Sequence, residues 1–326
     1  MHLTQGLSKS PKIAGAPSNA LGLAGYEPHL VYSLFDVYGT NQPVAKLRNS
    51  SGDVQDFTSA ELLDYNNITA DDSAFSTFRG PSAQVVTFDT IYQQNPAISG
   101  ANLTQSTVTD QPRFVFDNPS TGTYMIQSGT GHFMTADIPS SARNVLKQDL
   151  AFAITAMSTG VAFGSVDAAF FCINTDEGTG GNRRGFGQTA AFTTTPRFVE
   201  TGEDATATVA VNQTDQGTGM QSLILRSEGN SNGNNLRNAF VHGSKGSDET
   251  TDVGDFNGTF TKVGLFHYPN GGTETGIPTT LTLRAYEFII YAKTLTDADV
   301  TNIHSVQTYN NRTFTTTKQA NDSRYN

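Results

Sequence analysis

Residues 287–300 carry the sequence EFIIYAKTLTDADV, in which an apolar run leads into a polar turn and a second apolar position. The run closes a predicted strand over residues 280–291. Thr296 and Asp299 stand three residues apart, which is the spacing of a capping box at a helix start, with Asp in place of the preferred Glu or Gln. The stretch therefore predicts a strand followed directly by a short C-terminal helix.

The residues around this cap support the helix. Leu295 and Val300 flank the cap in the positions of a hydrophobic staple. Val300, Ile303 and Val306 then follow at helical spacing, and Tyr309 closes the same face. We expect this apolar face to lie on a sheet.

Upstream, short apolar segments alternate with turns rich in Gly, Asn and Ser, a pattern typical of β-sandwiches. The turn at 50–53 predicts a hairpin, and residues 59–65 predict a short helix. The first strand should place Val31, Phe35 and Val37 on one face and Leu30, Tyr32, Leu34 and Asp36 on the other. We predict an all-β fold, an antiparallel two-sheet jelly-roll sandwich with a short C-terminal helix. Its other strands are predicted at residues 29–38, 44–47, 54–57, 84–88, 113–116, 122–127, 150–157, 168–173, 206–211, 221–226, 239–242 and 259–267.

The length and composition fit one domain with terminal extensions. The chain has 326 residues, of which 36% are hydrophobic, enough to bury a core. A single β-sandwich can reach about 250 residues. We therefore expect an N-terminal arm at 1–28, a jelly-roll domain at 29–316 and a C-terminal tail at 317–326.

Charge argues against a nucleic-acid partner. Charged residues make up only 15% of the chain, against roughly 25% in ordinary globular proteins, and this low-charge surface suits extracellular or virion proteins. The net charge is −10, and the 20 basic residues are scattered, with Arg183-Arg184 as the only adjacent pair. Neutralising a phosphate backbone requires clustered Lys and Arg, so we expect no nucleic-acid partner.

Cysteine use and hydropathy bear on localisation. The single Cys172 has apolar neighbours, so we expect its side chain to be a small buried apolar group. Because one cysteine can form no intrachain disulfide, we expect the protein to be made in a reducing cytoplasm. We expect no signal peptide, because no basic region with an apolar run opens the chain. No stretch approaches the roughly 20 apolar residues of a membrane span, so we expect no membrane partner. Release by lysis, in a virus particle made in the host cytoplasm, fits these features.

Three segments resemble a known family. Residues 287–300 resemble the closing strand, cap and helix of concanavalin A-like (laminin-G-like) jelly rolls. Residues 35–57, which open with FDVY, and residues 85–115, which include VVTFDTIYQQNP, are similar to the opening of fungal α-L-arabinofuranosidase sandwiches and their phage and bacterial relatives. The family usually has Tyr-Asp-Gln-Ser where this chain has Tyr92-Gln93-Gln94-Asn95. The resemblance implies the jelly-roll fold. Many such relatives are modules of phage particles that have a binding or structural role and do not hydrolyse a glycoside.

Candidate catalytic residues are few. A retaining glycosidase needs two carboxyl groups about 5–5.5 Å apart. Asp176 and Glu177 follow an apolar strand, but adjacent residues on an extended strand point to opposite faces. A third carboxylate, such as Asp204 or Asp255, would have to approach from another loop. The alternative interpretation, a solvated acidic loop, is the one that we adopt, and we predict no catalytic residue and no enzyme.

Nothing in the sequence predicts a cofactor or a metal ion. The histidines are widely separated, without metal-ligand spacing: they are His2, His29, His132, His242, His267 and His304. The loops at 174–182 and 228–235 contain Asp, Asn and Gly but lack the ordered spacing of a calcium loop. The glycines at 178–181 precede no helix pattern, which argues against a phosphate-binding loop. Trp is absent, so an aromatic platform for a sugar would have to use Phe or Tyr.

These observations lead to three functional hypotheses. The first is a bacteriophage virion structural protein, decorating the capsid or attached to the tail, with its lectin-like jelly roll anchored to other virion proteins by the N-terminal arm. Symmetric virion positions and sandwich edges also favour a homo-oligomer. The second is a glycan-binding tail-fibre or receptor-binding module that contacts a host surface glycan. The third is a glycoside hydrolase.

Overall fold

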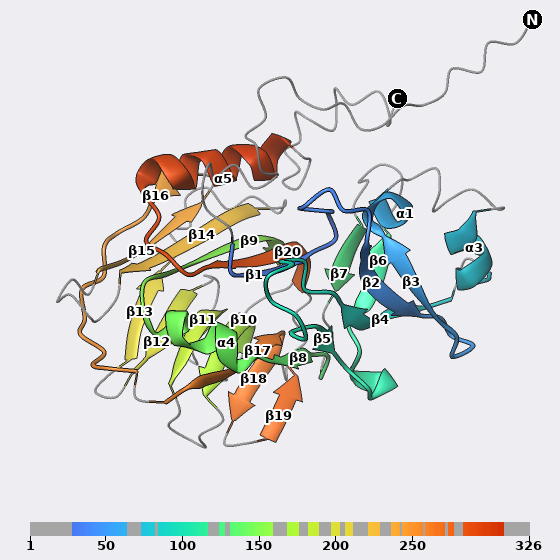
Figure 1. Cartoon of the computed structure of the whole chain (residues 1–326), viewed down its shortest axis with the longest axis horizontal. Helices are drawn as coiled ribbons and strands as arrows, with labels where there is room; N and C mark the ends of the chain where they lie inside the picture. Colours follow the sequence, from blue (N-terminus) through green and yellow to red (C-terminus); the bar gives the residue numbers. More distant parts are fainter. Residues whose placement is uncertain are drawn as a thin grey trace, which may run out of the picture.

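A computed structural model of the chain describes its central part (Figure 1). The expected N-terminal arm, except Pro28, and the expected C-terminal tail lie outside the described residues. No described helix is long and apolar enough to cross a membrane. The described ranges are 28–63, 73–81, 84–116, 124–127, 131–158, 168–175, 182–188, 197–202, 206–210, 221–228, 236–241, 243–256, 258–270, 273–276 and 283–309.

Two antiparallel sheets form the sandwich. In pairing order, the first contains β1 (Leu30–Ser33), β20 (Leu283–Tyr291), β9 (Leu150–Ser158), β14 (Gln221–Glu228), β15 (Leu236–Val241) and β16 (Ser244–Lys245). The second contains, again in pairing order, β8 (Met134–Asp137), β17 (Phe260–Leu265), β10 (Ala168–Thr175), β11 (Arg183–Gln188), β12 (Arg197–Thr201) and β13 (Thr206–Ala210).

A third group of strands joins the two sheets at one end, as Figure 1 shows on the right. It contains β3 (Val54–Thr58), β2 (Pro43–Arg48), β4 (Val86–Ile91), β5 (Leu103–Thr104), β6 (Arg113–Phe116) and β7 (Tyr124–Gln127). In this group β5 pairs with β8 of the second sheet and β7 pairs with β20 of the first. A separate hairpin consists of β18 (His267–Asn270) and β19 (Thr273–Gly276).

Short helices connect the strands, and one longer helix follows β20. They are α1 (Ser59–Leu63), α3 (Ala74–Arg79), α4 (Ser140–Arg143) and α5 (Asp297–Tyr309), with 3-10 turns η1 (Val108–Asp110) and η2 (Asn144–Lys147). Helix α5 lies over the first sheet (Figure 1). The helix predicted at 59–65 is thus confirmed as far as the described residues reach.

The alternation of β20 explains two apolar cores. Phe288 and Ile290 face the space between the sheets, where the larger cluster of buried residues lies. Ile289 and Tyr291 face the other way and form a second cluster with residues of α5, among them Val300. The first sheet is therefore covered on both faces, which accounts for the continuous apolar run in its sequence.

The start of α5 has the predicted cap. The Asp299 backbone N–H donates to Thr296 Oγ1 at 3.2 Å, and the Thr296 backbone N–H donates to Asp299 Oδ2 at 2.8 Å. Leu295 and Val300 are both fully buried in the cluster under the helix, and Ile303 is buried beside them. The capping box and the apolar contact of the staple are thus confirmed.

The first predicted strand is too long. Strand β1 ends at Ser33 because the chain turns there: the Phe35 backbone N–H donates to Ser33 Oγ at 3.0 Å, and Asp36 accepts the backbone N–H of Thr40 at 3.1 Å. Phe35 consequently packs against the core between the sheets, beside Tyr286, and not on the outer face. Its predicted orientation was wrong because the alternation of a strand does not continue through a turn.

Several other boundaries also differ. Strand β4 runs from Val86 to Ile91. It begins two residues after, and ends three residues after, the strand predicted at 84–88. The strand predicted at 259–267 is divided between β17 and β18 by Phe266, whose φ of 52° interrupts the extended backbone. Six strands were not predicted, since their sequences are short or contain charged residues or glycine: β5, β8, β11, β12, β16 and β19.

A charged cluster lies inside the sandwich and links the two sheets. Arg184 on β11 and Glu200 on β12 are fully buried and pair at 2.6 Å, and Arg237 on β15 bonds the other carboxylate oxygen. Ser227 on β14 donates to Glu200 Oε2 at 2.9 Å. Arg184 also donates to the carbonyl oxygens of residues 146 and 148. Two buried guanidinium groups thus share a single carboxylate, which is satisfied from both sheets.

Candidate functional site

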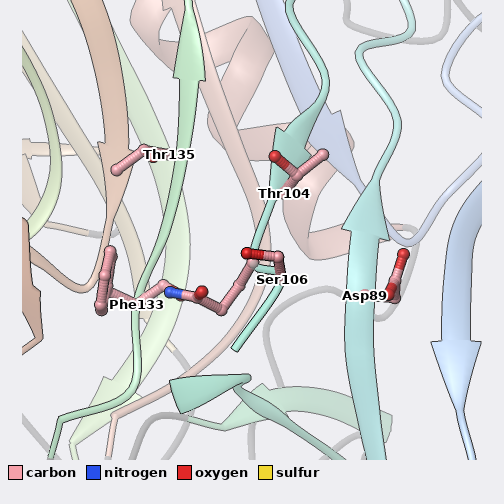
Figure 2. A pocket seen from close by; sticks show the side chains of 6 residues that line it. Asp89, Thr104, Ser106, Phe133 and Thr135 are labelled. Carbon is pink, nitrogen blue, oxygen red and sulfur yellow. The ribbon is translucent and has the colours of Figure 1, made fainter. Parts of the chain in front are cut away.

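A polar pocket of about 270 Å³ opens where the joining strands meet the second sheet. Figure 2 shows Asp89 of β4 on one side, Phe133 and Thr135 on the other, and Thr104 and Ser106 between them. The lining residues are Asp89, Thr104, Gln105, Ser106, Phe133 and Thr135. The volume lies just below the range of roughly 300–1,000 Å³ that is common for small-molecule sites.

Strand alternation turns these side chains outward. Thr104 of β5 and Thr135 of β8 are cross-strand partners. Their neighbours Leu103 and Met134 are fully buried in the core between the sheets. Because successive side chains on a strand point to opposite faces, both threonines face the pocket. Phe133, two residues before Thr135, is only partly buried.

Asp89 is held in place but not fully buried. Its Oδ2 accepts a hydrogen bond from an amino group of Arg48 at 2.6 Å, and its Oδ1 accepts one from Thr90 Oγ1 at 3.2 Å. The Asp89 side chain is 22% exposed to solvent. An ionised carboxylate has about four acceptor sites, so Asp89 retains capacity to accept a hydrogen bond from a ligand.

A buried amide fixes the floor of the pocket. Gln111 is fully buried; it accepts from Thr87 Oγ1 at 2.7 Å and donates to the Gln105 carbonyl oxygen at 2.7 Å. Gln105 in turn donates its backbone N–H to the Asp89 carbonyl oxygen at 3.2 Å and its side-chain amide to the Phe133 carbonyl oxygen at 3.3 Å. These bonds link both walls of the pocket, so the site is formed before any ligand arrives.

A tyrosine extends the polar surface beyond β4. Tyr92 donates its hydroxyl proton to Asp56 Oδ1 at 2.6 Å, and Lys46 lies 3.9 Å from the same oxygen. Desolvation raises the pKa of Tyr92, and the hydrogen bond to Asp56 and the charges of Asp56 and Asp89 raise it further. Tyr92 therefore stays a neutral hydrogen-bonding group near the pocket.

The candidate catalytic residues from the sequence are not brought together in the described part. Asp176, Glu177 and Asp204 lie outside the described residues. Asp255 is exposed and does not line the pocket. Most of the two predicted acidic and glycine-rich loops, 174–182 and 228–235, also lies outside the described residues.

The described residues contain no group of three or more His, Cys, Asp and Glu side chains that could hold a metal ion. His29 bonds the Ala142 carbonyl oxygen through Nε2 at 2.8 Å, and burial lowers its pKa. His2 and His242 lie outside the described residues. Cys172 is 1% exposed, and burial raises the pKa of its thiol to about 12, which confirms the prediction of an inert buried cysteine.

The residues that depart from the family pattern have structural contacts. Gln93, which stands where the family has Asp, donates its side-chain amide to the Asn95 carbonyl oxygen at 3.0 Å and to the Ile98 carbonyl oxygen at 2.6 Å. Asn95 donates to the Pro28 carbonyl oxygen at 2.7 Å. Gln93 therefore holds the turn that follows it and Asn95 holds the segment before β1, and neither lines the pocket.

The pocket was not predicted from the sequence, although two of its walls lie in the segment 85–115 that resembles the sandwich family. The predicted strand 84–88 stops one residue before Asp89, and β8 was missed. The available signal was Asp89 itself, a carboxylate within an apolar alternation, but its neighbours in space come from β5 and β8.

No family model and no curated protein matches this sequence. Among solved structures, the chain is similar to an arabinofuranosidase complexed with arabinofuranosyl-alpha-1,2-xylobiose, with a TM-score of 0.58 and 13% identity over 86% of this chain and 62% of that one. It is also similar to an α-L-arabinofuranosidase soaked with a cyclic sulfate inhibitor, with a TM-score of 0.56 and 12% identity over 86% and 62%. The binding domain of botulinum neurotoxin DC in complex with SialylT gives a TM-score of 0.43 and 9% identity over 82% and 52%.

At these identities the likeness to the two arabinofuranosidases concerns the fold alone. With the two antiparallel sheets, it confirms the predicted jelly-roll sandwich. This chain spans 62% of the arabinofuranosidase chains and about half, 52%, of the neurotoxin chain. The narrower resemblance to concanavalin A-like and phage-type families stays a prediction.

Proposed function

We propose that this protein is a glycan-binding module that holds a saccharide in the pocket between β4, β5 and β8. The observation that carries the proposal is the composition of the pocket: one carboxylate, three hydroxyl groups, one amide and one partly buried aromatic ring. A sugar offers hydroxyl groups around its rim and apolar C–H groups on its faces. Asp89 and the hydroxyl groups of the pocket can form hydrogen bonds with the sugar hydroxyls, and the Phe133 ring can pack against an apolar face of the sugar.

The fold is compatible with this proposal. The arabinofuranosidase in the comparison was solved with arabinofuranosyl-alpha-1,2-xylobiose, so a protein that contains a sandwich of this fold binds a saccharide. The pocket of this chain is hydrogen-bonded from both walls through Gln105 and Gln111. Such preorganisation lowers the entropic cost of binding a polar ligand.

The same pocket favours binding over hydrolysis. Asp89 is the single carboxylate among the described residues that line it. A two-carboxylate glycosidase mechanism requires a second carboxyl group, about 5–5.5 Å away for retention or 6.5–9.5 Å for inversion. Arg48 moreover bonds Asp89 at 2.6 Å, which fixes the position of this carboxylate in the pocket wall. We therefore propose a binding protein and not an enzyme.

Substitution within the pocket should weaken glycan binding. Asp89→Asn weakens the carboxylate contact and Phe133→Ala removes the ring, and each should reduce affinity at least tenfold, because a hydrogen bond to a charged group contributes about 1.5–3 kcal/mol. A glycan array followed by titration calorimetry on the best ligand measures the loss.

Asp137→Asn is the matched control for these substitutions. It removes a carboxylate on β8 that is 77% exposed on its side chain and paired with Lys262 at 3.1 Å, outside the pocket. It should bind like the parent protein. If all three variants bind equally well, the saccharide lies elsewhere. A blank array with folded protein would reject the proposed function.

We further propose that this module belongs to a bacteriophage particle, to which its N-terminal arm attaches it as a homo-oligomer. The low charge content supports this assignment, as does the similarity of the segments 35–57 and 85–115 to arabinofuranosidase sandwiches that have phage relatives. Immunogold labelling of purified particles is expected to place the protein on the capsid or the tail, and deletion of residues 1–28 is expected to prevent its incorporation. Unlabelled particles would contradict the assignment.

A further inference from the structure

We infer that the pocket selects uncharged sugars and excludes sugars that carry a carboxylate or sulfate group. This inference rests on the proposed glycan-binding function and concerns the ligand of the same site. It follows from the sign of the charges around the pocket and from the protein groups that these charges already contact.

Among the residues that the structure describes, the wall of the pocket carries a negative charge and no positive one. Of the six lining residues, Asp89 is the only one with a charged side chain, and the other polar groups are hydroxyls and one amide (Figure 2). Proteins that recognise carboxylate or sulfate groups use cationic side chains or clustered backbone N–H groups. The residues that line this pocket include neither Lys, Arg nor His.

The cation closest to Asp89 is already engaged by the protein. One terminal amino group of Arg48 bonds Asp89 at 2.6 Å, and the other bonds the Gly52 carbonyl oxygen at 3.0 Å. The Arg48 side chain keeps only 23% of its exposure. An anionic sugar would therefore have to compete with Asp89 for this guanidinium group, at the cost of leaving a carboxylate unpaired.

The remaining nearby cations do not line the pocket. Lys46 lies 3.9 Å from Asp56, a carboxylate that also holds the Tyr92 hydroxyl. Arg113 is exposed on β6 and lies near His132: burial lowers the pKa of His132, the positive charge of Arg113 lowers it further, and Asp110 raises it. The whole chain has a net charge of −10, which also repels anionic ligands at a distance.

Paired ligands that differ in one charge test the inference. The probes are lactose against sialyllactose and sulfated lactose, and xylotriose against its glucuronic-acid-bearing form, on one array and in titrations at low salt. Each neutral probe that binds should bind about tenfold or more tightly than its acidic counterpart, because like charges repel strongly in a partly desolvated site. Raising the ionic strength should narrow the difference.

A variant that lacks the charge of Asp89 distinguishes electrostatic repulsion of the acidic sugar from a poor steric fit in the pocket. Asp89→Asn keeps the size of the side chain and removes its charge, so the ratio of neutral to acidic binding should fall severalfold even though neutral binding itself weakens. Asp137→Asn should leave the ratio unchanged. Equal or tighter binding of the acidic probes would overturn the inference and leave glycan binding intact. Absence of binding to every probe, neutral and acidic, would overturn the proposed function as well.

Discussion

Replacement of Glu200 by alanine is expected to lower the free energy of unfolding by about 3–5 kcal/mol, because removing one partner of a buried ion pair leaves an uncompensated charge. Arg184 and Arg237 would both remain buried, and Ser227 would lose its acceptor. Urea denaturation followed by circular dichroism measures the difference. Since the free energy of unfolding of a typical domain is only about 5–15 kcal/mol, this loss should lower the melting temperature markedly.

The acid side of the stability curve provides an independent readout of the same carboxylate. Burial raises the pKa of Glu200, but the charges of Arg184 and Arg237 more than offset this and hold the pKa below its ordinary value. A carboxylate with a lowered pKa in the folded state stabilises the protein above its ordinary pKa. That contribution disappears as the pH falls from the ordinary value through the folded-state value. The stability difference between the parent and Glu200→Gln should therefore shrink over this acidic range.

The matched control for Glu200 is again Asp137→Asn. It breaks an exposed ion pair with Lys262, and exposed pairs contribute roughly 0–1 kcal/mol. Equal destabilisation by Glu200→Ala and Asp137→Asn would mean that the buried cluster is no more important than a surface pair.

Replacement of Phe171 by alanine is the second large effect, expected to cost about 3–5 kcal/mol through lost burial and the cavity left behind. Phe171 on β10 is fully buried and lies across the sandwich from the first sheet. Its ring contacts those of Tyr32, Phe152 and Phe288, with centroids 6.0, 5.9 and 5.2 Å away. Thermal and urea denaturation measure the cost.

Two further variants calibrate the Phe171 result. Phe171→Leu retains most of the volume and should cost much less than Phe171→Ala. Val54→Ala alters a side chain that is 47% exposed on the edge strand β3 and should change stability by no more than about 0.5 kcal/mol. If Phe171→Ala behaved like Val54→Ala, the two sheets would not depend on this contact.

Local pattern predicted those parts of the fold whose side chains alternate regularly. Strands β9, β10 and β20 and the cap of α5 were predicted from consecutive residues, because each buries an apolar face that the sequence displays. Strand β11 was not, since its sequence RRGFGQ contains two arginines and two glycines. The burial of Arg184 depends on Glu200 of another strand and on Ser227 of the other sheet, which both accept hydrogen bonds from it.

The pocket could not be predicted for the same reason. Asp89, Gln105 and Phe133 are distant in the sequence, and they meet only because β5 pairs with both β4 and β8. Local pattern indicates only carboxylates that are close along the chain, such as Asp176 and Glu177. A pocket assembled from three strands leaves no such local signal.

The burial of Cys172 makes the protein convenient for site-specific labelling. Cys172 is the only cysteine of the chain, is 1% exposed, and has a thiol whose pKa is raised to about 12. Maleimide reagents attack an accessible thiolate, so the native protein should remain unmodified without any cysteine being removed. A cysteine introduced at exposed Val54 would then be the single reactive thiol. A fluorophore attached there would allow binding to be followed in solution.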